Sequence, residues 1–148
     1  MKNIFNPTEQ EEIRKRLEKI TPESKSAWGE MNVAQMLTHC SKSMQMPTGE
    51  LMPTLSPMRF IGQFFKKKVL GEGSLGRNSP TAKEMKVVDV REFNSAKQEF
   101  LESYTKLIQG GESGAIAKNH PFFGKMTAKE WGRINYKHLD HHFSQFGA

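Results

Sequence analysis

The C-terminal stretch from Thr127 to Ala148 constrains the fold most, because it combines a helix start with histidines on an apolar face. Thr127, followed by Glu130, forms a capping box in which each side chain satisfies a free backbone N–H of the first helical turn. A histidine within an apolar face is costly unless its ring nitrogens are satisfied, so this helix needs partners for them. At about 100° per residue, one stripe of the helix carries Trp131, Ile134, Asn135, His138, His142 and Phe146.

Two histidines are central to this stripe. His138 and His142 lie one helical turn apart, the spacing at which two imidazoles on the same face can reach one metal ion. In the alternative, both hydrogen-bond inside the core to neighbours such as Asn135 or Tyr104, and the spacing alone leaves the two interpretations open. His141 points away from the stripe, by roughly 60 to 80°.

Three further segments have the apolar periodicity of helices. They run from Thr8 to near Thr21-Pro22, from Val33 to about Met46, and from Asn94 to near Gln109. Four amphipathic helices with no convincing strand pattern predict an all-α fold, a four-helix bundle made by residues 1–148 as a single domain. The long connection between the second and third helices permits a crossover that places those two helices parallel.

That connection, from Pro47 to Phe93, contains a candidate accessory helix that begins at Ser56-Pro57. Its apolar residues recur at helical spacing and are followed by three lysines, Lys66 to Lys68. Packing against the main body is the favoured interpretation, and a membrane surface or a nucleic acid strand is the alternative. Its phenylalanines could also form a homodimer surface: Phe60, Phe64 and Phe65.

Composition narrows the function classes. The net charge is +6, but the basic residues are spread along the chain, and neither a helix-turn-helix nor an aromatic RNA-binding motif is present, so we expect no nucleic acid partner. The single cysteine, Cys40, excludes an internal disulfide and lies on an apolar helix face, where we expect it to be buried. With no secretion signal and no run of about 20 apolar residues, we expect a cytoplasmic protein without membrane insertion.

The other two histidines give weaker signals. His39 lies at the edge of the apolar face of the second helix, where periodicity alone favours a partly exposed residue over a ligand. His120 precedes Pro121, which biases it towards an extended conformation and indicates a loop histidine.

Several motifs together resemble the DinB/YfiT-like superfamily, and are closest to a branch carried as a domain of unknown function. They are Trp28-Gly-Glu-Met, Met36-Leu-Thr-His39-Cys, His120-Pro-Phe-Phe-Gly-Lys-Met-Thr, Trp131-Gly, and Tyr136-Lys-His138-Leu-Asp-His141-His142-Phe-Ser-Gln-Phe-Gly. The resemblance implies an up-down-down-up bundle and a three-histidine site for a divalent metal. It adds His39 to His138 and His142 as the third ligand.

The resemblance also implies a chemistry. Three imidazoles with an open position suit zinc or nickel, whereas a non-haem iron site more often uses two histidines and a carboxylate. Relatives in the superfamily include thiol-dependent transferases and isomerases, so we expect a metal-dependent thiol S-transferase first and a hydrolase second. The substrate would be a small molecule, such as a low-molecular-weight thiol, and His141, Asn135 and His120 would lie around the ligands. A metal-binding or stress-related interaction protein without turnover is the alternative.

Overall fold

The computed structural model describes residues 1–77 and 81–148. In these ranges the chain forms five α-helices, one short 3₁₀ helix and one pair of antiparallel strands. The α-helices are α1 (Pro7–Glu18), α2 (Val33–Gln45), α3 (Arg59–Leu70), α4 (Phe93–Gly114) and α5 (Ala128–Gln145). The remaining elements are η1 (Lys83–Met85), β1 (Asn119–His120) and β2 (Gly124–Lys125).

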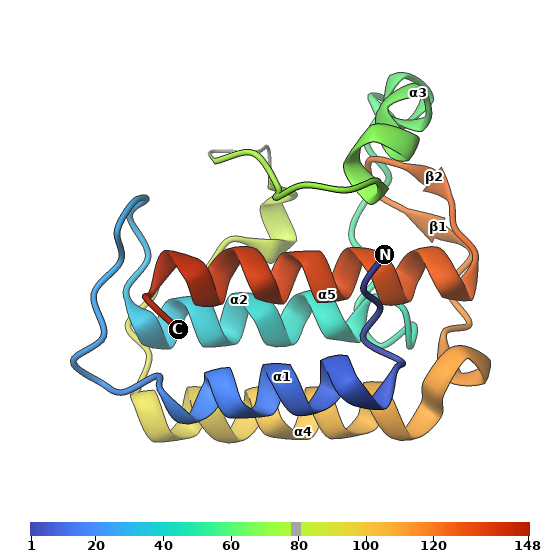
Figure 1. Cartoon of the computed structure of the whole chain (residues 1–148). Coiled ribbons are helices and arrows are strands. Elements are labelled where there is room, and N and C mark those ends of the chain that lie inside the picture. The colour runs from blue at the N-terminus through green and yellow to red at the C-terminus, as the bar shows by residue number, and fades with distance from the viewer. Residues whose placement is uncertain (78–80) are drawn as a thin grey trace.

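The prediction of an all-α four-helix bundle is therefore wrong. The predicted accessory helix is present as a full fifth α-helix, α3, which stands apart from the long helices beside a two-stranded sheet that was not predicted (Figure 1). The strands pair Asn119 with Lys125 and His120 with Gly124. They were missed because two-residue strands are too short to show the period-2 alternation by which strands are predicted.

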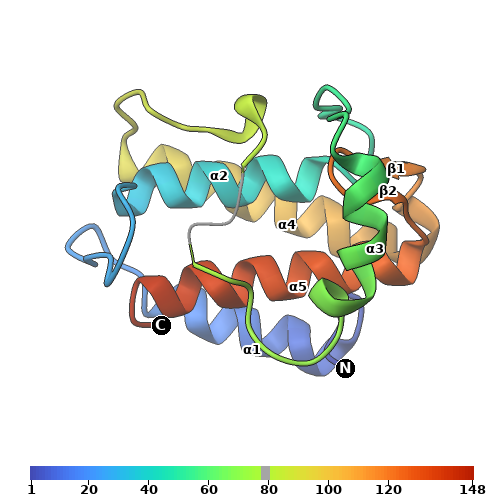
Figure 2. The ribbon, with the colours of Figure 1, turned by 90° about the horizontal axis from the view of Figure 1, so that it is seen from above.

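The longer helices run in two directions. In Figure 1, α1 and α5 run one way, and α2 and α4 run the opposite way. Helix α5 contacts each of the other four α-helices. Viewed from above, η1 lies near α2, and the segment after α3 passes over α5 (Figure 2). In the described residues, no helix is both long and apolar enough to cross a bilayer.

Side-chain caps fix where the two site-bearing helices begin. The predicted capping box of α5 is confirmed, with Thr127 and Glu130 each bonding the other's backbone N–H. Helix α2 has the same arrangement between Asn32 and Gln35. The other two long helices begin earlier than predicted: α1 starts with Pro7 at its N-terminus, and Glu92 caps α4 in place of Asn94.

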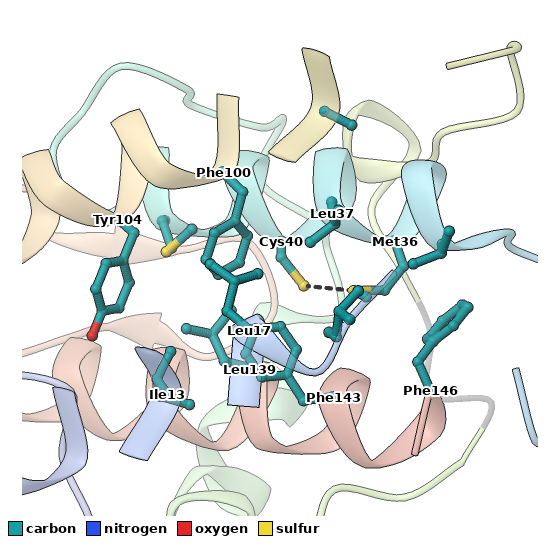
Figure 3. Close-up of a cluster of buried hydrophobic side chains, with 14 of the residues drawn as sticks. Ile13, Leu17, Met36, Leu37, Cys40, Phe100, Tyr104, Leu139, Phe143 and Phe146 are labelled. Carbon is teal, nitrogen blue, oxygen red and sulfur yellow. Dashed lines mark hydrogen bonds between the residues drawn. The ribbon is translucent and has the colours of Figure 1, made fainter. Parts of the chain in front are cut away.

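The main core lies between α1, α2, α4 and α5 (Figure 3). Phe100 of α4 packs against Phe143 of α5 with ring centroids 5.7 Å apart. Cys40 is fully buried as predicted, its thiol 3.7 Å from the sulfur of Met36, and burial raises the pKa of the thiol. It is therefore a core residue.

A second, smaller core lies under α3 and the strands, around Trp131. The indole N–H of Trp131 donates to the carbonyl of Ala117 at 2.7 Å, which ties the strand region to α5. The loop before the strands follows a kink at Gly111, whose φ of 56° is one that residues with a side chain rarely adopt. This is near the predicted end of the third long helix at Gly110-Gly111.

Candidate metal centre

Three histidines from two helices meet at one point. Helix α2 contributes His39, and α5 contributes His138 and His142, one turn apart. One ring nitrogen of each histidine lies within 4.8 Å of the other two, and the ring centroids are 4.6 to 4.9 Å apart. Nearly a hundred residues separate His39 from His138, so the contact between α2 and α5 creates the cluster. Such a group could hold a metal ion.

Two of the three imidazoles, those of His39 and His142, are oriented by hydrogen bonds from Nδ1 to oxygen acceptors. The Nδ1 of His39 lies 2.8 Å from the carbonyl oxygen of Met85, in η1. The Nδ1 of His142 lies 2.8 Å from the amide oxygen of Gln145, whose amide nitrogen donates to the carbonyl of Trp28. Because both acceptors are oxygens, each Nδ1 carries the proton. The Nε2 of each ring is therefore left with a free lone pair, as metal ligation requires.

The third ring, His138, is not satisfied in this way. Its Nε2 lies 3.0 Å from the Nε2 of His39. Since His39 already has its proton on Nδ1, a hydrogen bond between the two Nε2 atoms needs the proton of His138 on Nε2. That leaves Nδ1 of His138 as an acceptor, and this atom is buried without a hydrogen-bond partner in the described part of the chain.

The histidines do form hydrogen bonds within the core, but not to the two partners named in the structural alternative, Asn135 and Tyr104. The hydroxyl of Tyr104 donates to the carbonyl of Gln10, away from the histidines. The amide nitrogen of Asn135 donates to the carbonyl of Trp131. Its amide oxygen, like Nδ1 of His138, is buried and has no partner among the described residues. Two unsatisfied buried atoms one helical turn apart mark this site as unusual, since such atoms are normally paired.

Burial keeps the cluster neutral. It lowers the pKa of His142 to about 3, assisted by the neighbouring His39. Burial also places the pKa of His138 well below its usual value, and lowers the pKa of His39 against the opposing effect of the Met85 carbonyl. Neutral imidazoles are the form that binds metals, so at neutral pH protons compete little for these lone pairs.

The donor set fits a divalent ion of borderline softness. Ligands at about 2.1 Å from a tetrahedral ion lie roughly 3.4 Å from one another. The 3.0 Å between the Nε2 atoms of His39 and His138 is close to that value. In the described ranges no carboxylate belongs to the cluster, which separates it from the two-histidine, one-carboxylate sites of non-haem iron.

His141 lies beside the cluster but is not part of it. Its half-buried ring contacts His142 at 5.1 Å and Trp28 at 5.6 Å between centroids. The guanidinium of Arg77 lies 4.2 Å from the centre of the Trp28 ring. Burial lowers the pKa of His141, and a hydrogen bond to the carbonyl of Leu75 opposes that shift. Trp28, Arg77 and His141, which we call the rim, thus extend from the cluster to the surface.

His120 lies elsewhere, in the strand β1. Its ring stacks on Phe123 at 4.6 Å and contacts Trp131 at 5.4 Å, and its Nδ1 accepts the N–H of Phe122 at 3.1 Å. Burial lowers its pKa to about 4. None of its described hydrogen bonds or ring contacts is with His39, His138 or His142, although its charge contributes slightly to the lowered pKa of His138.

Sequence reasoning missed the groups that orient the ligands. Gln145 could have been noticed, because it lies three residues after His142 and hence on the same side of α5. The Met85 carbonyl could not, because any residue supplies a carbonyl and η1 is a single short turn. Trp28 belongs to one of the motifs of the family resemblance, but no sequence pattern links it to the site.

Comparison with known proteins places the chain in a family. No match is found among curated proteins, and none among solved structures. A family model described as a protein of unknown function (DUF1569) matches residues 5–148, which include all three histidines of the cluster and the rim. The chain therefore belongs to the DUF1569 family.

Proposed function

We propose that this protein binds one divalent metal ion through His39, His138 and His142 and uses it to activate a small-molecule thiol or a water. One observation carries the proposal: three neutral imidazoles from two helices converge, and two of them already direct an unprotonated Nε2 inwards. Zinc or nickel suits an all-imidazole site. A bound ion would supply Lewis-acid chemistry, lowering the pKa of a thiol or water that approaches it.

The protein's own residues prepare the site for the ion. The Met85 carbonyl and the Gln145 amide hold His39 and His142 in the tautomer that ligation needs. For His138 to bind through Nε2, its proton has to move to Nδ1. The amide oxygen of Asn135, buried without a described partner one turn earlier on α5, is the acceptor we assign to that proton.

The rim favours a thiol substrate over water. Low-molecular-weight thiols commonly carry a carboxylate, and the guanidinium of Arg77 is a cation on the Trp28 side of the cluster. His141, between Trp28 and His142, is placed to hold or accept a proton as the thiol ionises. Thiol S-transfer is thus our first choice. We also infer, from the motif resemblance, that the family is a branch of the DinB/YfiT-like superfamily.

An assay of purified, zinc- or nickel-loaded protein tests the proposal. Pairs of a thiol and an electrophilic acceptor are compared with simple esters and amides, using wild type and His142→Ala. We expect thiol consumption that requires the metal and is lost in His142→Ala. Circular dichroism confirms that the variant is folded.

Other outcomes lead to different conclusions. Hydrolysis without dependence on a thiol would replace transfer by the second activity. Metal binding without any turnover would indicate a binding or stress-related interaction protein. Activity that survives in folded His142→Ala would contradict an enzyme that acts through this site.

A further inference from the structure

Most apolar side chains of α3 are exposed, although Val69 and Leu70 at its C-terminal end pack into the second core. The predicted packing against the main body is confirmed for one side of the helix only: Phe64 is 85% exposed, and Phe60, Ile61 and Phe65 are between 51% and 64% exposed. Of the twelve exposed large hydrophobic residues in the described ranges, seven lie within residues 52–65. Single exposed apolar residues are ordinary, but a contiguous group of this kind marks an interaction surface.

The orientation of α3 is fixed by its opposite side. A Cβ on Gly62 would lie 1.7 Å from the carbonyl oxygen of Phe122, so the helix backbone touches the loop between the strands there. Lys66 bonds the Lys125 carbonyl at 2.7 Å and pairs with Glu130 at 2.9 Å. At 100° per residue, Gly62 lies about 180° and Lys66 about 140° from the stripe of Phe60 and Phe64. The attachment of α3 therefore directs its aromatic stripe outwards.

The C-terminal end of α3 is also tied to the body. The ammonium group of Lys137, on α5, donates to the carbonyls of Val69 and Gly71, the latter at 2.7 Å. Leu70 is buried in the second core. The exposed face is thus presented by a helix that is held along its length.

The charged residues in this part of the sequence are all basic. From Leu51 to Leu70 the chain has four basic residues and no acidic one. Lys67 and Lys68 are exposed one turn beyond Phe64 on the same side of the helix, and the guanidinium of Arg59 lies 4.9 Å from the centre of the Phe60 ring. Aromatic and aliphatic residues bordered by cations match the interface of a bilayer that contains anionic lipids.

A second copy of the chain fits less well. In a two-fold contact the same patch meets itself, so Lys67, Lys68 and Arg59 would approach the like charges of the other copy. Like charges brought together across an interface cost binding free energy. A nucleic acid strand would use stacking aromatic residues, whereas Ile61, Met58 and Met52 offer no ring to a base.

We propose that the exposed face of α3, formed by Met58, Phe60, Ile61, Phe64 and Phe65 with Arg59, Lys67 and Lys68, docks on the surface of an anionic lipid bilayer. The helix lies on the interface and inserts its phenyl rings among the acyl chains near the headgroups. The catalytic proposal is not required for this one, because the metal ligands lie on α2 and α5.

Vesicle flotation tests the proposal with the full chain. Vesicles of phosphatidylcholine alone are compared with vesicles that also contain phosphatidylglycerol. Wild type is expected to float with the anionic vesicles and not with the neutral ones. Phe60→Ser with Phe64→Ser should weaken binding by at least about tenfold, because two apolar side chains no longer insert. Lys67→Gln with Lys68→Gln should weaken it by about tenfold, and added salt should do the same.

The matched control is Val88→Ser with Val90→Ser, which removes two equally exposed apolar residues away from α3. It should bind anionic vesicles as the wild type does. Equal binding to both kinds of vesicle, or no binding to either, would overturn the proposal. So would light scattering that shows a dimer in the wild type and a monomer in Phe60→Ser with Phe64→Ser, because the occupant would then be a second copy.

Discussion

Two buried histidine environments in this protein differ in how their imidazoles are satisfied. His120 is 7% exposed and is enclosed by Phe123 and Trp131, and its Nδ1 accepts a backbone N–H. His39 and His142 are equally buried, at 5% and 7%, but they face a third imidazole, His138, which keeps an unpaired nitrogen. Burial and a lowered pKa are common to both environments, so neither identifies a ligand.

What separates the environments is where the lone pairs point. The single ring in the strands uses its unprotonated nitrogen for a local backbone contact. In the cluster, the unprotonated Nε2 atoms of His39 and His142 face the ring of His138, whose single proton can pair with only one of them. We therefore expect the cluster histidines to act as metal ligands and His120 to stabilise the fold, and experiments can separate these two roles.

The largest expected effect is on metal affinity. His138→Ala should weaken zinc binding by more than the roughly 100-fold that loss of an outer hydrogen-bond partner costs, because a ligand itself is removed. His120→Ala should bind zinc as the wild type does. Competition with a chromophoric chelator measures both. If folded His120→Ala lost as much affinity as His138→Ala, the division between the two environments would be wrong.

In the metal-free protein, His120→Ala is expected to reduce stability more than His138→Ala does. His120→Ala should lower the free energy of unfolding by about 3 kcal/mol, because it opens a cavity beside Trp131 and leaves the Phe122 N–H unpaired. His138→Ala in metal-free protein should cost less, because it also removes a buried nitrogen that has no described partner. Urea unfolding of both proteins after metal removal is the measurement. A larger loss in His138→Ala would mean that this ring has a packing role.

A smaller effect is expected for the residue that holds His142. Gln145→Leu removes the acceptor of the His142 Nδ1 proton and should weaken zinc affinity by about 10 to 100-fold. Gln109→Leu, an exposed change on α4, is the matched control and should leave the affinity unchanged. Equal affinity in Gln145→Leu and wild type would show that the amide does not set the tautomer.

The smallest expected effect is on the pH dependence of the free energy of unfolding. The pKa of His120 is lowered from 6.5 to about 4, so the unfolded chain binds a proton that the folded chain does not. Its contribution to stability is complete above pH 6.5 and is lost as the pH falls towards 4. Between pH 7 and pH 5, metal-free wild type should lose about 1 to 2 kcal/mol more stability than His120→Gln. Equal losses of stability in the two proteins would contradict a lowered pKa of His120 in the folded chain.

Local sequence patterns predicted the elements that repeat over many residues. The capping box of Thr127 and Glu130 and the stripe with His138 and His142 are set within one helix, so periodicity finds them. The strands β1 and β2 were missed because two residues carry no period, and the outward orientation of α3 depends on the contact of Gly62 with Phe122, sixty residues away.

The site was predictable only in part for the same reason. Periodicity left His39 at the edge of α2, and only the resemblance to a known superfamily grouped it with His138 and His142. The structure brings these three together. The Met85 carbonyl reaches His39 from the short turn η1, and the Arg77 guanidinium reaches Trp28 from a loop, and no local pattern encodes the paths of these connections.

A calorimetric titration of zinc into metal-free protein tests the central claim most directly, with wild type and His39→Ala compared at neutral pH. We predict one ion per chain in the wild type and loss of this binding in folded His39→Ala, because α2 then no longer contributes a ligand to the two on α5. No binding to the wild type, or the same binding to both proteins, would contradict a metal centre formed by these three histidines.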